Sequence, residues 1–142
     1  KASKTSHESA ALVAGALVRA DADGIPSHGV ARLPVYADQA KAGKVDGHAV
    51  PEITETGTAA VRVDAKRGFA YPAITAGLAR ARDMVPNAGV VAVPIGNSSH
   101  PAVLGLHCVD LPTYRLAALI LANTPPALPP RGPHRALSRT TP

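Results

Sequence analysis

Apolar residues with helical spacing mark the first part of the chain. They are Leu12, Val13, Ala16, Leu17 and Ala20. This spacing predicts an amphipathic helix. Thr5 and Glu8 precede it as a capping box, in which Thr5 is the N-cap and Glu8 reaches back to it. The helix is expected to end near Asp21, because Gly24 and Pro26 follow.

A second, shorter helix is expected before the first strand. It runs to about Ala42 and ends at Gly43. Pro34 fits this helix only in its first turn, where a missing N–H is harmless. Residues 44–58 contain glycine and proline at several positions, so we expect irregular structure there with a brief extended piece at 52–54.

The middle of the chain alternates between strand and helix patterns. Residues 60–64 alternate apolar and polar side chains, which predicts a strand with one wet face. A helix follows and is expected to end at Pro86. Residues 89–93 and 116–121 are apolar runs that predict buried strands, with a helix around 103–109 between them. Strand, helix, strand, helix, strand is the order of an α/β fold.

The 142 residues are expected to form one domain in three parts. Residues 1–43 are the helical part, residues 59–123 are an α/β core, and residues 124–142 are a tail rich in proline and arginine. Five of the ten residues from 124 to 133 are proline, so no regular structure is expected there. Aromatic residues make up only 3% of the chain, so small aliphatic side chains must fill the core.

Charge and cysteine content limit the classes of function. A net charge of +5 permits anion binding, but the scattered basic residues and rare aromatics argue against a nucleic-acid partner. A binder that uses Arg131, Arg135 and Arg139 of the tail is kept as a third hypothesis. Cys108 is the single cysteine, which fits a reducing, cytoplasmic compartment. No apolar run approaches the roughly 18 residues that cross a bilayer, so no membrane partner is expected. The chain begins with Lys1, and we expect a fragment or a processed product.

Residues 23–36 carry the side chains with the clearest chemistry. His28 can donate or accept a proton near neutral pH, and the planar guanidinium of Arg32 matches a carboxylate. Together they suit a 2-hydroxy or 2-oxo acid. If the segment is helical from about Val30, Arg32 and Tyr36 share one face, with His28 at the entrance to it. On spacing alone, a solvated surface turn is the alternative.

Two polar loops follow the predicted buried strands. Asn97-Ser98-Ser99-His100 follows the first strand, and Asn123-Thr124-Pro125 follows the second. If the two strands are parallel neighbours, the loops meet at one edge of the sheet, where α/β folds often carry catalytic groups. Taken alone, each loop is more consistent with an ordinary polar connection than with a site. No metal site is expected.

Taken in order, these segments resemble the type-2 malate/L-lactate dehydrogenase family, which also includes ureidoglycolate, sulfolactate and diketogulonate oxidoreductases. The matching segments are residues 24–36, 97–100, 105–107 and 122–125. The resemblance implies an oxidoreductase that uses NAD or NADP on a small 2-hydroxy or 2-oxo acid such as malate or lactate. It also implies a homodimer and the family's own α/β fold, with N-terminal helices plus a sheet with flanking helices. That fold is not a Rossmann domain, and the chain has no G-x-G-x-x-G after a strand.

The resemblance also assigns roles to residues. Those on the substrate side are Ser27, His28, Arg32, Tyr36 and His100. His28 and His100 take catalytic acid–base roles, while Arg32 holds the substrate carboxylate. Ser27 and Tyr36 are expected to contact the substrate. Asn123 and Thr124 fall where the nicotinamide end of the cofactor is contacted.

The chain departs from the family pattern at several turns. Pro101 and Ala102 stand where the family has an aromatic residue and a glycine, and Arg115 replaces a glycine that ends a helix. Pro112 interrupts that same helix. A side chain is strained where a glycine takes positive φ. Family members are also more than twice as long, so the fold is expected to be incomplete. The alternative function is therefore an inactive, truncated remnant that acts as a dimerisation or interaction module.

Overall fold

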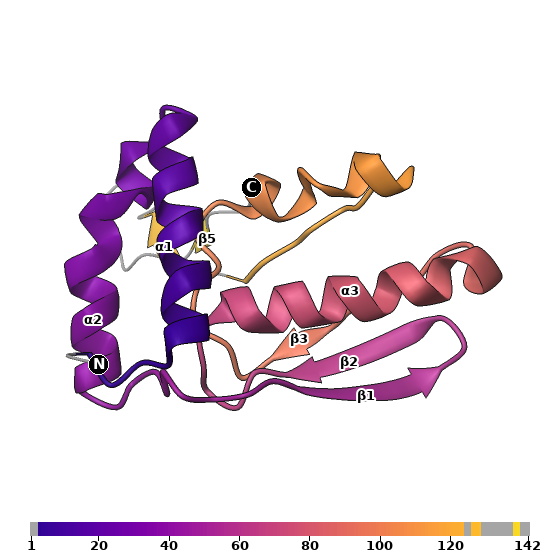
Figure 1. Cartoon of the computed structure of the whole chain (residues 1–142), viewed down its shortest axis with the longest axis horizontal. Coiled ribbons are helices and arrows are strands. Elements are labelled where there is room, and N and C mark those ends of the chain that lie inside the picture. The colour runs from indigo at the N-terminus through magenta and orange to yellow at the C-terminus, as the bar shows by residue number, and fades with distance from the viewer. Residues whose placement is uncertain (1–2, 124–125, 129–137, 140–142) are drawn as a thin grey trace.

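The computed structural model describes residues 3–123, 126–128 and 138–139 of the chain. Two helices, α1 (His7–Ala22) and α2 (Leu33–Lys41), stand side by side at the left of Figure 1, and α3 (Ala70–Ala88) lies along a small sheet at the right. Two 3-10 turns, η3 (Leu104–Cys108) and η4 (Leu111–Tyr114), pass above α3. The α/β class predicted from the sequence is confirmed, and the described sheet is mixed.

Helix α1 (His7–Ala22) begins one residue later than its capping box predicts. Ser6 is the N-cap, and its Oγ accepts a hydrogen bond from the amide of Ser9 at 3.1 Å. The hydroxyl of Thr5 instead donates to the carbonyl of Ser3, so Thr5 does not cap the helix. The buried apolar residues of α1 follow the predicted spacing: they are Val13, Leu17 and Ala20.

The chain makes two single 3-10 turns before the second helix. They are η1 (Pro26–His28) and η2 (Val30–Arg32), and α2 (Leu33–Lys41) follows directly. Pro34 lies in the first turn of α2, which is the only place where the sequence allowed it. The helix ends shortly before Gly43, as predicted.

Three strands form the sheet in the order β1-β2-β3. β1 (Glu52–Gly57) pairs antiparallel with β2 (Ala60–Asp64), and β2 pairs in parallel with β3 (Ile95–Gly96). β1 is thus longer than the extended piece predicted at residues 52–54. The predicted wet face of β2 is confirmed, because Arg62 is exposed between two buried valines.

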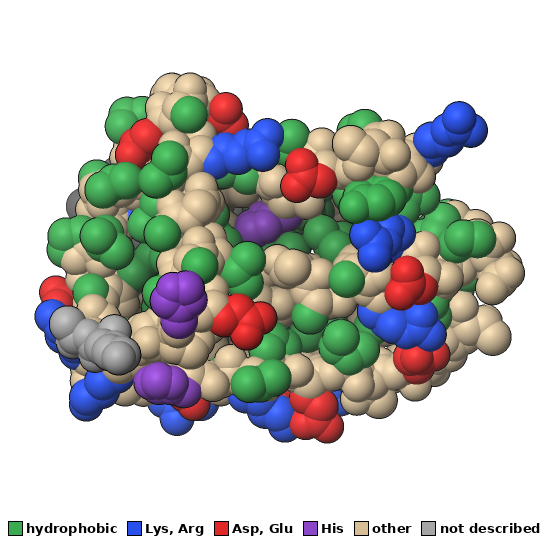
Figure 2. All heavy atoms as spheres, viewed as in Figure 1, with side chains coloured by type: hydrophobic (Ala, Val, Ile, Leu, Met, Phe, Trp, Pro, Cys, Tyr) green, Lys and Arg blue, Asp and Glu red, His purple; other side chains and the backbone are tan. Residues whose placement is uncertain are grey.

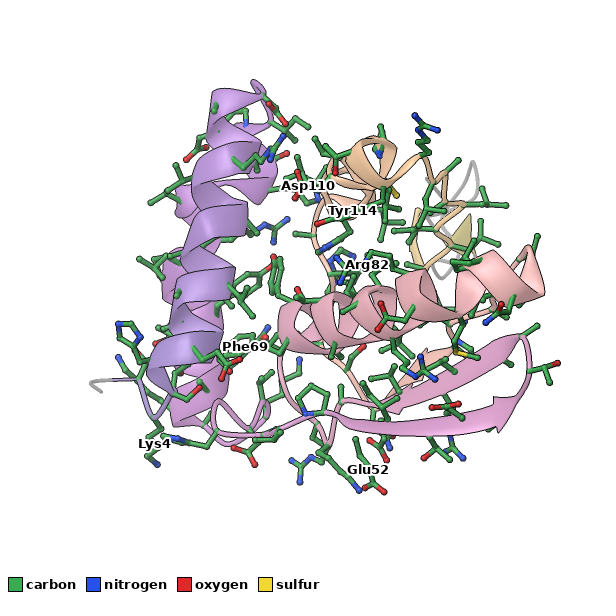
Figure 3. All side chains as sticks on the ribbon, turned by 45° about the vertical axis from the view of Figure 1, so that its right-hand side comes forward. Lys4, Glu52, Phe69, Arg82, Asp110 and Tyr114 are labelled. Atoms are coloured by element: carbon green, nitrogen blue, oxygen red, sulfur yellow. The ribbon has the colours of Figure 1, made fainter. Side chains whose placement is uncertain are left out.

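Helix α3 (Ala70–Ala88) packs against β2. Gly77 lies at the point of closest approach, where a Cβ would be only 2.7 Å from Cγ1 of Val93. The absence of a side chain therefore lets the helix lie directly on the sheet. Arg82 of α3 and Tyr114 of η4 face one another (Figure 3), with the guanidinium 4.6 Å from the ring centre.

The prediction that Pro86 ends this helix is wrong. Pro86 lies inside the last turn, and the helix ends at Gly89, whose amide donates to the carbonyl of Val85 at 2.8 Å. A proline so close to the end removes one hydrogen bond without breaking the turns that precede it.

The buried strand predicted at residues 89–93 is also wrong in its position. Val90 is 78% exposed, and the hydrogen bonds to β2 begin only at the carbonyl of Ala92, which accepts from Val61 at 2.9 Å. The carbonyl of Pro94 accepts the next bond, from Val63. The pairing is therefore shifted along the chain, at an edge of the described sheet where an apolar run is covered on one side only.

The strand predicted at residues 116–121 is not present. This segment forms no regular element, and Leu119 and Leu121 are 85% and 77% exposed. The helix predicted around residues 103–109 is the short 3-10 turn η3. An apolar run alone does not create a strand, because a strand also needs a neighbour for its backbone hydrogen bonds.

Two clusters of buried residues make up the core. One joins α1 and α2 to the start of α3, and its members are Val13, Leu17, Tyr36, Ala40, Val45, Phe69 and Tyr71. The other lies between the sheet and α3, and its members are Val61, Val63, Ala65, Ala73 and Met84. The first cluster lies beneath the segment that carries the predicted substrate-side residues.

The tail contains a short pair of strands, β4 (Pro126–Leu128) and β5 (Ser138–Arg139), in antiparallel arrangement. The expectation of no regular structure over residues 124–133 is therefore wrong for β4. Arg131 and Arg135 lie outside the described residues. No described helix combines the length and the apolar character needed to cross a membrane.

Candidate active site

Three ionisable side chains that the sequence predicted as site residues lie close together near the C-terminal half of α1. His28 ends η1 and Arg32 ends η2, while His100 lies in the loop after β3. The three groups interact electrostatically, because the charges of His28 and Arg32 both act on His100. His28 is half-buried, whereas Arg32 and His100 are exposed and open to a ligand.

Local hydrogen bonds organise His28 and Arg32. The Ser27 hydroxyl lies 3.0 Å from Nδ1 of the His28 ring. The Nε of Arg32 donates to the carbonyl of Ser27 at 2.7 Å, and its backbone amide donates to the carbonyl of Gly29. Arg32 forms no ion pair with any described residue. Its charge is therefore held in place without being neutralised, which suits an anionic ligand.

The environment of His100 keeps its ring neutral and fixes its tautomer. Partial burial, and then the nearby charges of His28 and Arg32, lower the pKa of His100 below the usual 6.5. Its Nδ1 accepts a hydrogen bond from the amide of Ala102 at 3.0 Å. The ring proton is therefore on Nε2, and His100 is a neutral hydrogen-bond donor at pH 7.

The other residues of the His100 loop have structural contacts. The Asn97 side chain donates to the Asp64 carboxylate at 3.1 Å. The Ser99 hydroxyl accepts from the amide of Ala70 at 3.2 Å, at the start of α3. The loop that carries His100 is thereby attached to both β2 and α3.

Tyr36 lies in the core rather than at the surface. It is 8% exposed, and its hydroxyl is 3.4 Å from that of Tyr71. Burial, and then the contact with Tyr36, raise the pKa of Tyr71 well above its usual value, so the Tyr71 phenol stays protonated. The predicted role of Tyr36 in substrate binding stays a prediction.

Two hollows adjoin the site. A small cavity of about 10 Å³ is lined by His28, Tyr71 and His107 together with apolar side chains. An open groove of about 320 Å³ runs between α1, α3 and η3 (Figure 2), with Arg19 and Asp110 among its lining residues. His107 lines both hollows, and burial lowers its pKa. Its Nε2 lies 3.1 Å from the carbonyl of Pro101, beneath the His100 loop.

The cofactor-side predictions are less well placed. Asn123 is exposed at the end of the extended segment after η4, away from both hollows. Thr124 lies outside the described residues. No three His, Cys, Asp or Glu side chains of the described part are grouped so that they could hold a metal ion.

Asp21 is a site residue that the sequence patterns did not single out. Its carboxylate accepts a hydrogen bond from the amide of Val30, between His28 and Arg32. An acidic residue near the end of a helix is common, so its type and position gave no signal. The contact depends on the turn geometry of residues 23–29.

Two of the predicted departures are indeed at left-handed positions. Ala102 has φ +56° and Arg115 has φ +59°, where glycine is normally preferred. Pro112 is accommodated in the first turn of η4. Ala102 therefore carries backbone strain directly beside His100.

Relief of that strain should stabilise the chain. We expect Ala102→Gly to raise the free energy of unfolding by about 0.5–1 kcal/mol, because a left-handed residue with a Cβ costs roughly 1–2 kcal/mol and the lost methyl contact offsets part of it. Ala14→Gly, at an exposed position of α1, is the control and should cost about 1 kcal/mol. Thermal unfolding of both variants measures the two effects. A loss of stability in Ala102→Gly equal to that in the control would contradict the strain.

Comparison with known proteins shows which family the chain is similar to. A family model described as malate/L-lactate dehydrogenase matches residues 1–142. The chain is 41% identical over 133 residues to (2R)-3-sulfolactate dehydrogenase (NADP(+)) of Chromohalobacter salexigens, covering 94% of this chain and 40% of that protein. It is 38% identical over 138 residues to Delta(1)-pyrroline-2-carboxylate/Delta(1)-piperideine-2-carboxylate reductase of Pseudomonas syringae pv. tomato, covering 97% and 40%.

Solved structures agree with the sequence relatives. Delta1-piperideine-2-carboxylate reductase from Pseudomonas syringae superposes with a TM-score of 0.72 at 40% identity, over 75% of this chain and 32% of that one. Malate dehydrogenase from Pyrococcus horikoshii superposes with a TM-score of 0.70 at 28% identity, over 76% and 31%. The chain thus spans about 40% of the length of the curated relatives cited above.

Proposed function

The chain belongs to the malate/L-lactate dehydrogenase family, and on that premise we propose that it provides the substrate-binding and proton-transfer groups of an NAD- or NADP-dependent oxidoreductase. The proposed substrate is a small 2-hydroxy or 2-oxo acid. The observation that carries the proposal is the grouping of His28, Arg32 and His100, in which two imidazole rings lie beside a cation that forms no ion pair within the described part of the chain.

Arg32 is the group that binds the substrate carboxylate. Its Nε is fixed by the carbonyl of Ser27, so the terminal nitrogens of the guanidinium can contact two carboxylate oxygens. This holds the neighbouring carbonyl carbon in one orientation, which lowers the entropic part of the barrier to reaction.

His28 is the group that moves the proton. In the direction of reduction, the carbonyl oxygen gains a proton from His28, while the hydride would come from the bound nicotinamide. In the direction of oxidation His28 takes that proton back from the hydroxyl. Because its neutral ring carries a proton on Nε2, His100 is assigned a hydrogen bond to the same oxygen. The Ser27 hydroxyl is within hydrogen-bond distance of Nδ1 of the His28 ring and helps to orient that ring.

A nicotinamide dinucleotide supplies the hydride when bound. The sulfolactate dehydrogenase of Chromohalobacter salexigens is named as an NADP(+) enzyme, and a cofactor of this class is the one we propose for this chain. The described residues do not by themselves fit it, since exposed Asn123 is the only cofactor-side residue among them and lines neither hollow. The steps derived for these residues are therefore substrate binding and proton transfer alone.

A cyclic imine of a 2-carboxylate is a second candidate substrate. The similarity to the pyrroline- and piperideine-2-carboxylate reductase favours it. Such an imine shares the reacting geometry of a 2-oxo acid, with an unsaturated carbon beside a carboxylate. Arg32 would serve both, and the relative rates with pyruvate and with Delta(1)-piperideine-2-carboxylate distinguish them.

The test is binding of oxamate, an unreactive analogue of pyruvate, to the 142-residue chain. We expect Arg32→Ala to raise the oxamate dissociation constant by about 10- to 100-fold, because it removes a charge-assisted, two-point contact. Arg62→Ala is the matched control, since Arg62 is exposed on β2 and the net charge changes equally. NMR titration of the backbone amides measures both constants.

The outcomes separate the two functional readings. If Arg32→Ala and Arg62→Ala weaken oxamate binding equally, the loss is explained by the change in net charge. That result would contradict the assigned site. No binding of oxamate by the unaltered chain would favour the alternative of a dimerisation or interaction module. The homodimer and the cytoplasmic location stay predictions from the family resemblance.

A further inference from the structure

The carboxylate of Asp21 lies directly against the loop that joins η1 to η2. Its Oδ2 accepts a hydrogen bond from the amide of Val30 at 2.9 Å. Gly29, which is buried, lies beneath the same carboxylate. A Cβ built on Gly29 would overlap the Asp21 carboxylate, whose Oδ1 and Cγ lie nearest to it. The contact thus requires both an acceptor at residue 21 and a glycine at residue 29.

This contact is at the midpoint between the two substrate-side groups. His28 is the last residue of η1, Val30 is the first of η2, and Arg32 is the last of η2. The amide of the first residue of a helical turn has no partner within the turn, so a carboxylate oxygen there acts as a cap. Asp21 provides that cap from α1, nine residues earlier in the chain.

At its start the loop is attached to α1, because the amide of Ile25 donates to the carbonyl of Ala20 at 2.8 Å. The hydrogen bonds that follow are internal to the loop. Backbone amides of His28, Gly29 and Arg32 donate to carbonyls within residues 25–29, and the Arg32 side chain donates to the carbonyl of Ser27. These bonds shape the loop, but they do not attach its centre to the helix. Among the described residues, the hydrogen bond that attaches residues 28–32 of the loop to α1 is the one from Val30 to Asp21.

We propose that Asp21 is a positioning residue that sets the spacing of His28 and Arg32 for a 2-oxo acid. The proposal rests on the function proposed above for its ligand, but the anchoring contact itself does not. In a 2-oxo acid the carboxylate and the carbonyl oxygen are on adjacent carbons, so the groups that bind them must be held at a fixed separation. A loop whose centre is attached to α1 keeps that separation before the acid binds, which avoids an ordering cost.

Four forms of the 142-residue chain test the proposal: the unaltered chain, Asp21→Ala, Asp21→Asn and Asp23→Ala. Asparagine keeps an acceptor oxygen for the Val30 amide. Asp23 is exposed two residues further on, and no described residue forms a hydrogen bond with its side chain, so Asp23→Ala matches the change of charge. Hydrogen exchange of the Val30 amide and the dissociation constant of oxamate are measured well below the unfolding temperature.

We expect Asp21→Ala to speed exchange at Val30 and to raise the oxamate dissociation constant, each by about tenfold, which is the size of effect that loss of one cap produces. Asp21→Asn should stay within about threefold of the unaltered chain in both measurements. Asp23→Ala should change neither. Rescue by asparagine together with a null effect at Asp23 is a result that general destabilisation or net charge does not produce.

Failure has three distinguishable forms. If exchange at Val30 rises in Asp21→Ala but oxamate binds as tightly as before, Asp21 caps the turn without positioning the site, and the proposal is overturned while the proposed function stands. If the unaltered chain does not bind oxamate, the proposed function falls and the positioning role falls with it. If hydrogen exchange at Val30 is unchanged in Asp21→Ala, the hydrogen bond between Val30 and Asp21 does not anchor the loop, and the proposal is overturned.

Discussion

Replacement of His28 by alanine is expected to lower the turnover number by about 100- to 10,000-fold, the usual contribution of a general acid–base group. The methyl group cannot give a proton to the carbonyl oxygen, and the neutral ring of His100 is a poor substitute because its pKa is lowered. The Michaelis constant should change little, since Arg32 still binds the carboxylate. Initial rates of NADH or NADPH oxidation with pyruvate or oxaloacetate measure both quantities.

His7→Ala is the control for this prediction. His7 is exposed at the first turn of α1, far along the helix from the residue 28 loop, and should be dispensable. Full turnover in His28→Ala would sink the assignment of proton transfer to His28. Equal losses in His28→Ala and in His100→Ala would instead show that the two rings act as one unit.

The second large effect is expected on stability. Leu17 is 2% exposed and belongs to the core cluster that joins α1 and α2 to the start of α3. Leu17→Ala should lower the free energy of unfolding by about 2–5 kcal/mol through lost burial and the cavity left behind. That is a large part of the roughly 5–15 kcal/mol that stabilises a typical domain. Urea unfolding followed by circular dichroism measures the loss.

The neighbouring residue provides a matched comparison. Val18 is on the same helix but is 60% exposed, so Val18→Ala should cost less than about 0.5 kcal/mol. Similar midpoints for Leu17→Ala and Val18→Ala would mean that the packing of α1 on α2 is wrong. Because α1 also carries Asp21, Leu17→Ala should disturb the residue 28 loop before the sheet is affected.

The fold could be predicted from the sequence where one face of an element is buried, because the apolar residues of that element then recur with a regular period. α1 and β2 each bury one face against a neighbour, so periods of 3.6 and 2 residues indicated both elements. The wrong strand predictions concern apolar runs that are not covered by packed neighbours on both sides. Val90 is exposed, and residues 116–121 form no strand among the described residues, because hydrophobicity records a tendency to be buried and not the presence of a partner.

The site was predictable in part for a different reason. The grouping of His28 with His100 came from resemblance to a family, since no local spacing relates two such distant residues. Asp21 and Tyr71 were not predictable, because their roles depend on contacts made after the chain turns. The αL positions of Ala102 and Arg115 were inferred only because glycine was expected there.

The exposed segment at residues 116–121 also has a consequence for how the chain behaves in solution. Its six residues, Leu-Ala-Ala-Leu-Ile-Leu, contain no charge and no proline, and two of the leucines are largely open to water. Segments of this composition stack readily into intermolecular β-structure. The chain in isolation should therefore lose solubility as its concentration rises, and mild heating will convert it into aggregate before complete unfolding is reached. The thermodynamic stability of this chain and its resistance to aggregation thus depend on different residues.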